Sequence, residues 1–267
     1  MAVLCLKVSD KDGNTIAVAR DEDEVNLLCT RMYQKGDKIT LESSEHGLYL
    51  WLSVDDALGK SLIYLNDSNL EYQIPFQEKR TNLSPKAFWG EKHLLSVKIA
   101  KKFEISTYRN LALNVNDQHQ NTTYYPHATA NVETRGESVF EAKNAIDGVT
   151  ISSCHGEWPF ASWGINKNPE AEIKIDFGRN VLVDSIVIYL RADFPHDNWW
   201  KNGMIQFSDG TQIDLSFEKT GKQQIFKFDL KHITWLKLFH LIQSEEPSPF
   251  PALTQIEVYG VDELIEE

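Results

Sequence analysis

The sequence predicts an all-β protein that is made of two β-sandwich domains of the jelly-roll kind. Short runs in which apolar and polar residues alternate recur along the chain, and Gly, Asp, Asn and Pro separate them. Alternation with a period of two is typical of half-buried strands, and this punctuation is typical of the turns between strands. Amphipathic helical patterns are almost absent. The best helical candidate is the short segment DEDEVNLLCTRMY at 21–33.

The strand-like runs fall into two sets. The start, MAVLCLKVSDKDG, predicts a first strand followed by a hairpin turn, and the further runs of the first 100 residues are NTIAVA, DKITLES, GLYLWLSV, KSLIYLN, EYQIPF and HLLSVKIA. The runs after residue 170 are AEIKIDFG, VLVDSIVIYL, MIQFSDGTQIDLSF, QQIFKFDL, TWLKLFHLIQ and TQIEVYGV. Within MIQFSDGTQIDLSF, the step Asp209-Gly210 between alternating arms predicts a β-hairpin.

A polar, weakly periodic segment at 114–140 lies between the two sets. The domain boundary is therefore predicted near residue 109, with an N-terminal sandwich over 1–108 and a C-terminal sandwich over 109–267. Both lengths are ordinary for single domains. The role of the N-terminal sandwich is left unassigned, although its strand aromatics, such as Trp51 and Tyr64, are expected in the core or on the sheet surface.

Composition and motifs exclude several classes of function. The formal net charge of −12 argues against nucleic acid and against anionic membranes, because both attract Lys-rich and Arg-rich surfaces. No apolar run approaches the length of about 18 residues that a membrane helix needs. The start lacks signal-peptide features, which predicts a cytoplasmic location if it is native and an extracellular one if a leader was removed. Motifs such as GxSxG, HExxH and the P-loop are absent, so no enzyme activity is expected.

Ordered motifs in the second half carry a resemblance to a known family. They are NLAL at 110–113, ATANVE at 128–133, AKNAIDG at 142–148, SWGINKNPEAEIKIDFGR at 162–179 and LTQIEVYG at 253–260. In this order they resemble the discoidin, or coagulation factor 5/8 type C, family of galactose-binding-like, lectin-like carbohydrate-binding modules. The resemblance implies a jelly roll over about residues 109–262 and a binding function without catalysis.

Many members of that family hold a structural calcium ion between an early Asp-Gly loop and the last strand. The resemblance implies a ligand set of the Asn144 carbonyl, the Asp147 carboxylate, the Val149 carbonyl, Ser152, the Ile256 carbonyl and the Glu257 carboxylate. Ca²⁺ prefers six to eight oxygen ligands, so this donor set suits it. The alternative is that Asp147-Gly148 is only a turn and that Glu257 is only an exposed strand residue.

Aromatic and polar residues gather in three loops that the resemblance places at one end of the sandwich. A sugar needs an aromatic plate for its C–H face and planar polar groups for its hydroxyls. The candidate ligand-binding residues are His155, Glu157, Trp158, Arg191, His196, Asp197, Asn198, Trp199, Trp200 and Phe250. The sequence therefore predicts a carbohydrate-binding site in these loops.

Several residues of these loops also have a structural interpretation. Trp163 is expected in the core. Of Trp199 and Trp200, one is expected in the core and the other in the loop as a sugar platform, because neighbouring strand residues point to opposite faces. Arg191 either binds sugar hydroxyls or pairs with Asp193 or Asp197, and His196 either contacts ligand or completes a turn.

Two functions follow from these observations. The favoured prediction is a non-catalytic carbohydrate-binding protein that recognises a glycan through the end loops of its C-terminal domain. The alternative is a protein-interaction or scaffold module, whose protein partner would use the same exposed aromatic residues.

Overall fold

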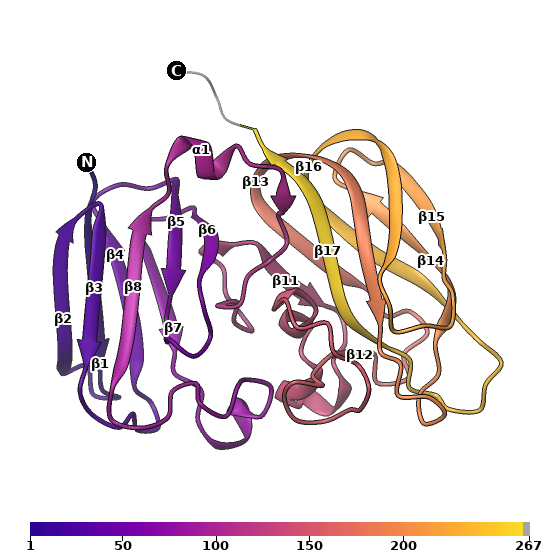
Figure 1. Cartoon of the computed structure of the whole chain (residues 1–267), viewed down its shortest axis with the longest axis horizontal. Helices are drawn as coiled ribbons and strands as arrows, with labels where there is room; N and C mark the ends of the chain where they lie inside the picture. Colours follow the sequence, from indigo (N-terminus) through magenta and orange to yellow (C-terminus); the bar gives the residue numbers. More distant parts are fainter. Residues whose placement is uncertain (264–267) are drawn as a thin grey trace.

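Strands with alternating buried and exposed side chains build the first half of the chain as two facing antiparallel sheets (Figure 1). The structure is a computed structural model and describes residues 1–263. The first sheet has the order β2-β1-β4-β7 and contains β1 (Val3–Ser9), β2 (Thr15–Glu22), β4 (Lys38–Ser43) and β7 (Asn69–Gln73). The second has the order β10-β6-β5-β8-β3 and contains β3 (Glu24–Cys29), β5 (Leu48–Ser53), β6 (Ser61–Leu65), β8 (His93–Ile99) and β10 (Tyr124–Tyr125).

The segment that had the best helical pattern is a strand. Residues 24–29 form β3, in which Val25, Leu27 and Cys29 are buried and the residues between them are exposed. This period of two matches a sheet packed on one face, and pairing with β8 overrides the helical expectation. The helices that the structure describes are short, namely α1 (Lys102–Ile105), η1 (Gln77–Arg80), η2 (Thr134–Gly136), η3 (Ser138–Phe140) and η4 (Ala142–Ile146).

The second half curls one antiparallel sheet around its own core. Its strands are β9 (Arg109–Asn110), β11 (His127–Ala130), β12 (Trp163–Gly164), β13 (Ile173–Leu190), β14 (Trp200–Phe207), β15 (Gln212–Ser216), β16 (Gln224–Gln243) and β17 (Ala252–Asp262). The long strand β13 pairs with β16 on one side and with β17 on the other, with register shifts along it. Such irregularities bend strands, which lets the sheet close over the core. The predicted all-β fold with two sandwiches is confirmed.

Both predicted hairpins are present. In the first, β1 pairs with β2 and the Asp10 carboxylate accepts hydrogen bonds from the backbone N–H groups of Asp12 and Asn14. In the second, β14 pairs with β15, and Gly210 has a φ of 85° in the turn. A positive φ of this size favours glycine, which explains why the Asp209-Gly210 step predicted this turn.

The chain crosses between the two halves more than once. The strand β9 pairs with β17 in the second half, whereas β10 pairs with β6, and the fully buried Tyr124 belongs to the N-terminal core. Asp262 of β17 receives hydrogen bonds from Arg109, from Arg179 and from the hydroxyl of Tyr49. The division at residue 109 stays a prediction, because the segment that follows it packs on both halves.

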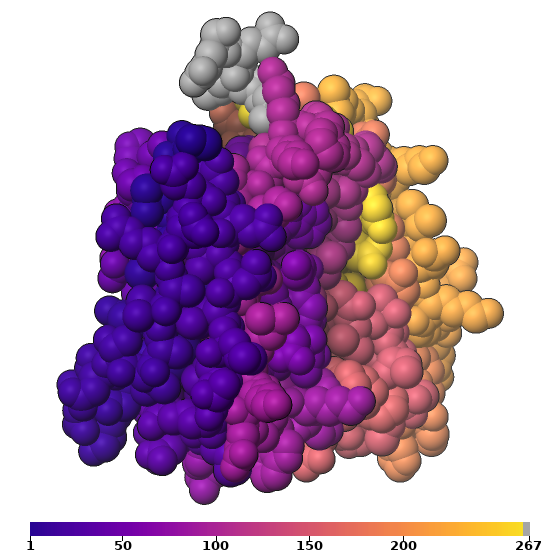
Figure 2. All heavy atoms as spheres, turned by 60° about the vertical axis from the view of Figure 1, so that its left-hand side comes forward, coloured from indigo at the N-terminus to yellow at the C-terminus, as the bar shows by residue number. Residues whose placement is uncertain are grey.

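Hydrogen bonds of side chains also join the two halves. Asn82 Nδ2 donates to Asn144 Oδ1 over 2.8 Å, and the Ser138 hydroxyl donates to the Glu78 carbonyl over 2.7 Å. In the space-filling view, purple and magenta segments fill the region between the indigo sandwich and the pink and yellow parts (Figure 2). Across residues 1–263, no helix is both long and apolar enough to cross a membrane.

Candidate functional site

Loops at one end of the C-terminal sandwich enclose a pocket of about 290 Å³. They leave the end of β13 and lead into β14 and β17, so the sheet itself brings them together. We call this pocket the Phe250 pocket. Its lining residues are Thr134, Arg135, Phe140, His155, Gly164, Ile165, Asn166, Arg191, His196, Asp197, Phe250, Pro251 and Ala252.

Phe250 supplies the exposed aromatic surface of this pocket. Phe250 is 38% exposed, and the Lys167 ammonium lies 4.8 Å from the centre of the Phe250 ring. Prolines flank Phe250 on both sides and restrict the backbone there. The preceding loop is fixed by Asn198, whose Nδ2 donates to the carbonyls of Glu246 and Ser248 over 2.8 Å each. The ring is thus held in place before any ligand arrives.

Arg191 and Asp197 form the polar wall. Arg191 Nε lies 2.7 Å from Asp197 Oδ2, and a second bond joins Arg191 Nη2 to Asp197 Oδ1. The remaining guanidinium contacts are to the Ser162 hydroxyl at 3.5 Å and the Phe250 carbonyl at 3.4 Å. Paired contacts of this geometry are strong and directional. The expectation that Arg191 pairs with a nearby Asp is therefore met, and both residues line the pocket.

Two histidines stand at the rim. Both His155 and His196 are exposed, and His155 Nδ1 forms a hydrogen bond with the Asp193 carboxylate. The His196 N–H donates to the Asp193 carbonyl, which closes a turn. Ligating atoms of His155, Asp193 and Asp197 lie within 4.8 Å of one another. Because Arg191 already engages both oxygens of Asp197, and Asp193 is hydrogen-bonded to His155, this group is a hydrogen-bonding rim.

Phe140 forms the floor and was not among the residues that the sequence singled out. It is 8% exposed, and the guanidinium carbons of Arg135 and Arg191 lie 5.5 and 5.8 Å from its ring centre. Asn166 was missed as well, and Asp193 was considered only as a partner of Arg191. Asp193 lies inside the aromatic loop at 191–203, so its place beside His196 was a usable signal, whereas Phe140 comes from the polar, weakly periodic segment at 114–140.

The burial of the two adjacent tryptophans shows which of them lies in the core. Trp200 begins β14, is 1% exposed and lies 6.3 Å from Trp163 in the core. Trp200 is thus corrected from a candidate ligand contact to a core residue, since a buried ring offers no face to a sugar. Trp199 is half-buried against the same core, and its Nε1 lies 3.4 Å from Glu246 Oε1. Asn198 is 0% exposed and acts as the anchor of the 244–248 loop, which corrects its place on the list of ligand contacts.

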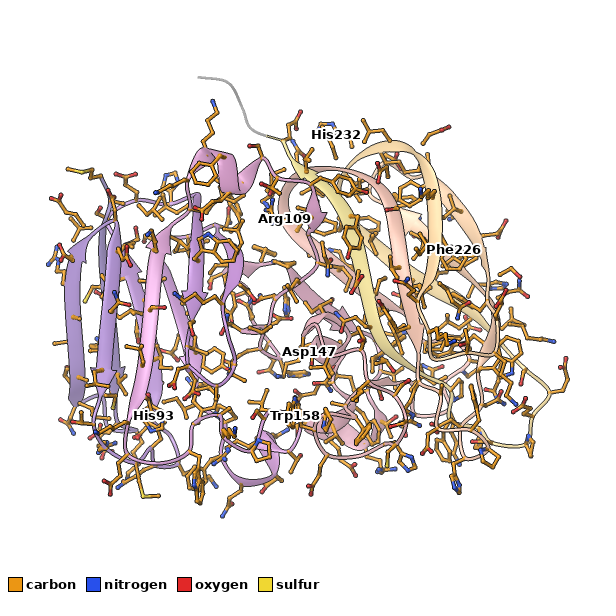
Figure 3. All side chains as sticks on the ribbon, viewed as in Figure 1. His93, Arg109, Asp147, Trp158, Phe226 and His232 are labelled. Carbon is orange, nitrogen blue, oxygen red and sulfur yellow. The ribbon has the colours of Figure 1, made fainter. Side chains whose placement is uncertain are left out.

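Glu157 and Trp158 belong to a different hollow. Trp158 is 37% exposed and lines two depressions beside the N-terminal sandwich, and Glu157 lines one of them. Figure 3 shows Trp158 at the edge where the two halves meet, with His93 of the N-terminal sandwich at the same edge. The loop at 153–160 therefore presents His155 to the Phe250 pocket and Trp158 to the junction.

The residues of the expected calcium site provide two desolvated carboxylates. Burial raises the pKa of Asp147 to about 7, against a hydrogen bond from the Val149 N–H and the attraction of Lys143. Burial also raises the pKa of Glu257, although the Tyr259 hydroxyl donates to it over 3.1 Å. The helix η4, which precedes Asp147, packs against β17, which carries Glu257. Partly exposed carboxylates whose charged form is disfavoured by desolvation, and which have few donors, fit a hard cation.

The other expected ligands of that ion are uncharged: three are backbone carbonyls and one is the Ser152 hydroxyl. For Asn144, Val149 and Ile256 the expectation concerns backbone carbonyls, and the Asn144 side chain is occupied by Asn82 and by the Ser138 carbonyl. The Ser152 hydroxyl lies against Gly221, in the loop before β16. A Cβ atom added to residue 221 would come within 2.5 Å of the Ser152 oxygen. The carboxylates of Asp147 and Glu257 would therefore supply the charge that holds the ion.

Comparison with known proteins gives a family for the second half of the chain. The family model described as "Domain of unknown function (DUF7402)" matches residues 123–256. No curated protein matches the chain. The matched span includes η4, β11 to β16 and the loops of the Phe250 pocket.

Solved structures also match, at low identity. Chitosan-binding module 1 from the chitosanase/glucanase of Paenibacillus sp. IK-5 is 20% identical, with 57% of this chain and 98% of that chain covered and a TM-score of 0.39. A fucose binding module of Streptococcus pneumoniae is 13% identical, with 57% and 98% covered and a TM-score of 0.41. The family 32 CBM of NanJ from C. perfringens, solved with galactose, is 19% identical, with 49% and 91% covered and a TM-score of 0.38.

Each of these three proteins is a carbohydrate-binding module by its name. Their TM-scores lie below 0.5, so the ligand has to be inferred from the side chains of the Phe250 pocket.

Proposed function

The chain belongs to the family described as Domain of unknown function (DUF7402), and from the site's own geometry we propose that it is a non-catalytic carbohydrate-binding protein. The proposed site is the Phe250 pocket. Its ligand is proposed to be a sugar unit whose C–H face lies on the Phe250 ring. The sugar's hydroxyl groups would then meet the Arg191–Asp197 pair and the two histidines of the rim.

One observation carries this proposal: an exposed aromatic ring and a buried, two-point ion pair face the same small pocket. A sugar ring has an apolar face and an edge of hydroxyl groups, so it needs both kinds of surface at once. The Arg191–Asp197 pair presents fixed donors and acceptors, while Phe250 offers area without a hydrogen-bonding group. A volume of about 290 Å³ suits a small ligand better than a protein surface, which needs a broad contact.

The composition of the pocket favours binding without chemistry. Glycoside hydrolysis uses a pair of carboxyl groups, one of which donates a proton. Two acids stand at this pocket, Asp197 in its lining and Asp193 at its rim, and both are engaged: Arg191 binds both oxygens of Asp197, and His155 is hydrogen-bonded to Asp193. Carboxylates held in this way orient a ligand and accept hydrogen bonds, which is a binding role.

The test is a binding titration by calorimetry with galactose, fucose and chito-oligosaccharides, the sugars named for the matched modules. Wild type would be compared with Phe250→Ala, which should lose affinity about tenfold or more because it loses the aromatic face. Phe250→Trp, which keeps an aromatic plate, should retain binding. The matched control is Ile242→Ala, an exposed apolar side chain that does not line the pocket.

The outcomes separate the two functions that the sequence left open. Sugar binding that is lost in folded Phe250→Ala and kept in the control supports the proposal. Sugar binding that is unchanged in Phe250→Ala would place the site elsewhere. If well-folded wild type binds none of these sugars, the carbohydrate function is rejected for this set, and the interaction-module alternative is pursued with a protein partner.

We also propose that Ca²⁺ binds between Asp147 and Glu257 as a structural clamp. The support is the desolvation of both carboxylates and the packing of η4 on β17. A bound Ca²⁺ would supply positive charge and join the loop that follows η4 to the last strand.

A further inference from the structure

A second aromatic hollow lies at the junction of the two halves. It has a volume of about 500 Å³, and its polar and aromatic lining includes Asp56, Ser84, Lys86, Trp89, Lys92 and Trp158. An adjoining depression of about 210 Å³ shares Trp158 and is lined also by Arg80 and Glu157. Together they form what we call the interdomain groove. It shares no lining residue with the Phe250 pocket.

Two tryptophans of this groove are exposed to solvent. Trp89 is 65% exposed and Trp158 is 37% exposed, whereas Trp163 and Trp200 are 1% exposed or less. An indole left in water forgoes the gain that burial of its large apolar surface would bring. Indoles that two separate segments hold beside one hollow therefore indicate a surface that is covered when a ligand binds.

The Trp89 ring and the backbone that carries Trp158 are held in position. The Arg80 guanidinium carbon lies 5.3 Å from the centre of the Trp89 ring, and Arg80 Nη2 donates to the Pro85 carbonyl over 3.1 Å. The cation thus supports one face of Trp89. The backbone N–H of Trp158 donates to the Thr81 carbonyl over 2.7 Å, which fixes the 153–160 loop to the N-terminal sandwich. The groove is complete only because the two halves are docked.

The polar groups of the groove have both signs of charge and are balanced. Arg80, Lys86 and Lys92 are basic, while Asp55, Asp56 and Glu157 are acidic. The buried Asp55 accepts hydrogen bonds from the Ala57 and Phe88 N–H groups, so it serves the local fold. Lys86 and Lys92 both line the groove, and neither takes part in an ion pair among the described residues, so their ammonium groups are available as donors. This balance suits an uncharged ligand with many hydroxyl groups.

We propose that the interdomain groove is a second carbohydrate site, which binds a chain of neutral sugar units with one unit on Trp89 and another on Trp158. The lysines and Asp56 would bond to hydroxyl groups along the chain. This inference goes beyond the proposed function, because the groove is separate from the Phe250 pocket and draws residues from both halves. It assigns a role to the N-terminal sandwich, which supplies every lining residue of the larger hollow except Trp158.

The test is calorimetry with cellohexaose, laminarihexaose and N-acetylchitohexaose, each beside its monosaccharide. One or more hexasaccharides should bind, and the monosaccharide should bind far more weakly, because it reaches one ring only. Trp89→Ala and Trp158→Ala should each lower the hexasaccharide affinity about tenfold or more, while Trp89→Phe and Trp158→Phe should retain most of it. The matched control is Phe103→Ala, an aromatic residue 67% exposed on α1 and outside the groove.

The two sites are told apart with Phe250→Ala, which should leave tryptophan-dependent hexasaccharide binding intact. The second site is overturned if folded wild type binds none of the hexasaccharides, or if folded Trp89→Ala and Trp158→Ala bind them as wild type does. It is also overturned if binding depends on Phe250 alone, a result that supports the proposed function instead. Binding of oligogalacturonate in place of the neutral sugars would contradict the neutral-ligand assignment.

Discussion

Arg191 and Asp197 form a two-point ion pair that is almost completely removed from solvent, at 5% and 2% exposure. The pair lies where β13 ends, and the Arg191 N–H donates to the Ala252 carbonyl at the start of β17. Because the cost of burying each charge is offset by the other, the two residues depend on each other for stability. The same pair gives the Phe250 pocket its fixed polar wall.

Removing one partner of this pair should destabilise the fold strongly. Asp197→Asn leaves the Arg191 charge buried without its counter-ion, so the free energy of unfolding should fall by about 3–5 kcal/mol. The double variant Arg191→Met with Asp197→Leu should recover most of that loss while binding no sugar. Urea unfolding followed by fluorescence measures the free energy of unfolding of the single and the double variant. Equal losses in the single and double variants would contradict the mutual dependence.

The neighbouring tryptophans should differ sharply in their effect on stability. Trp200→Ala creates a cavity beside Trp163 and should lower the free energy of unfolding by about 3–5 kcal/mol. Trp199→Ala removes a half-buried ring, so its loss should be near the typical value of about 1 kcal/mol. Parallel urea titrations test this order. A larger loss for Trp199→Ala would mean that the strand has the opposite register.

Calcium should stabilise the fold through Asp147. With Ca²⁺ about 100-fold above its Kd, the free energy of unfolding should rise by about 2.7 kcal/mol, because the ion binds only the folded state. Asp147→Asn keeps the shape but loses the charge, so its melting temperature should not respond to Ca²⁺ or EDTA. Asp229→Asn, an exposed acid on β16, is the matched control. An equal Ca²⁺ response in wild type and Asp147→Asn would exclude this site.

Stability should also depend on pH through His119. Its Nε2 lies 3.1 Å from Glu133 Oε2, and this hydrogen bond raises the pKa of His119 above 6.5. The folded state therefore holds the proton more tightly than the unfolded chain. The contribution is fully present below pH 6.5 and is lost as the pH rises through the folded-state pKa. Because half of the His119 side chain is exposed, about 0.5 kcal/mol is expected.

The measurement for His119 compares wild type with His119→Gln by urea unfolding at about pH 5.5 and about pH 8.5. The difference in free energy between the two proteins should be present at the lower pH and should vanish at the higher one. A difference that is the same at both values would show that packing, and not protonation, accounts for the effect of His119.

Local patterns were sufficient for most of the strands. The step Asp209-Gly210 predicted the β14–β15 hairpin because glycine readily adopts the positive φ found there. The segment 24–29 was harder, since three apolar residues in alternation are too few to separate a strand from a short helix. Its pairing with β8 comes from residues about 70 positions away, which no local pattern contains.

The site was predictable in part. His155, Arg191, His196, Asp197 and Phe250 were singled out from the sequence, and all five line the Phe250 pocket. Glu157 and Trp158 were assigned to the same pocket but line the interdomain groove, because the loop that carries them has two sides. Phe140 was missed because its segment gives no strand signal. It joins the pocket only through the packing of η3 against β12.

The sequence by itself determined the class of fold, the two hairpins and the kind of side chain that the end loops carry. These properties depend on alternation and turn chemistry, which act over a few residues. The tertiary structure alone decided that Trp200 is buried, that Asn198 anchors a loop and that Trp158 faces the other half. The burial of a side chain depends on what packs over it, and at these positions the covering residues are far away in the sequence.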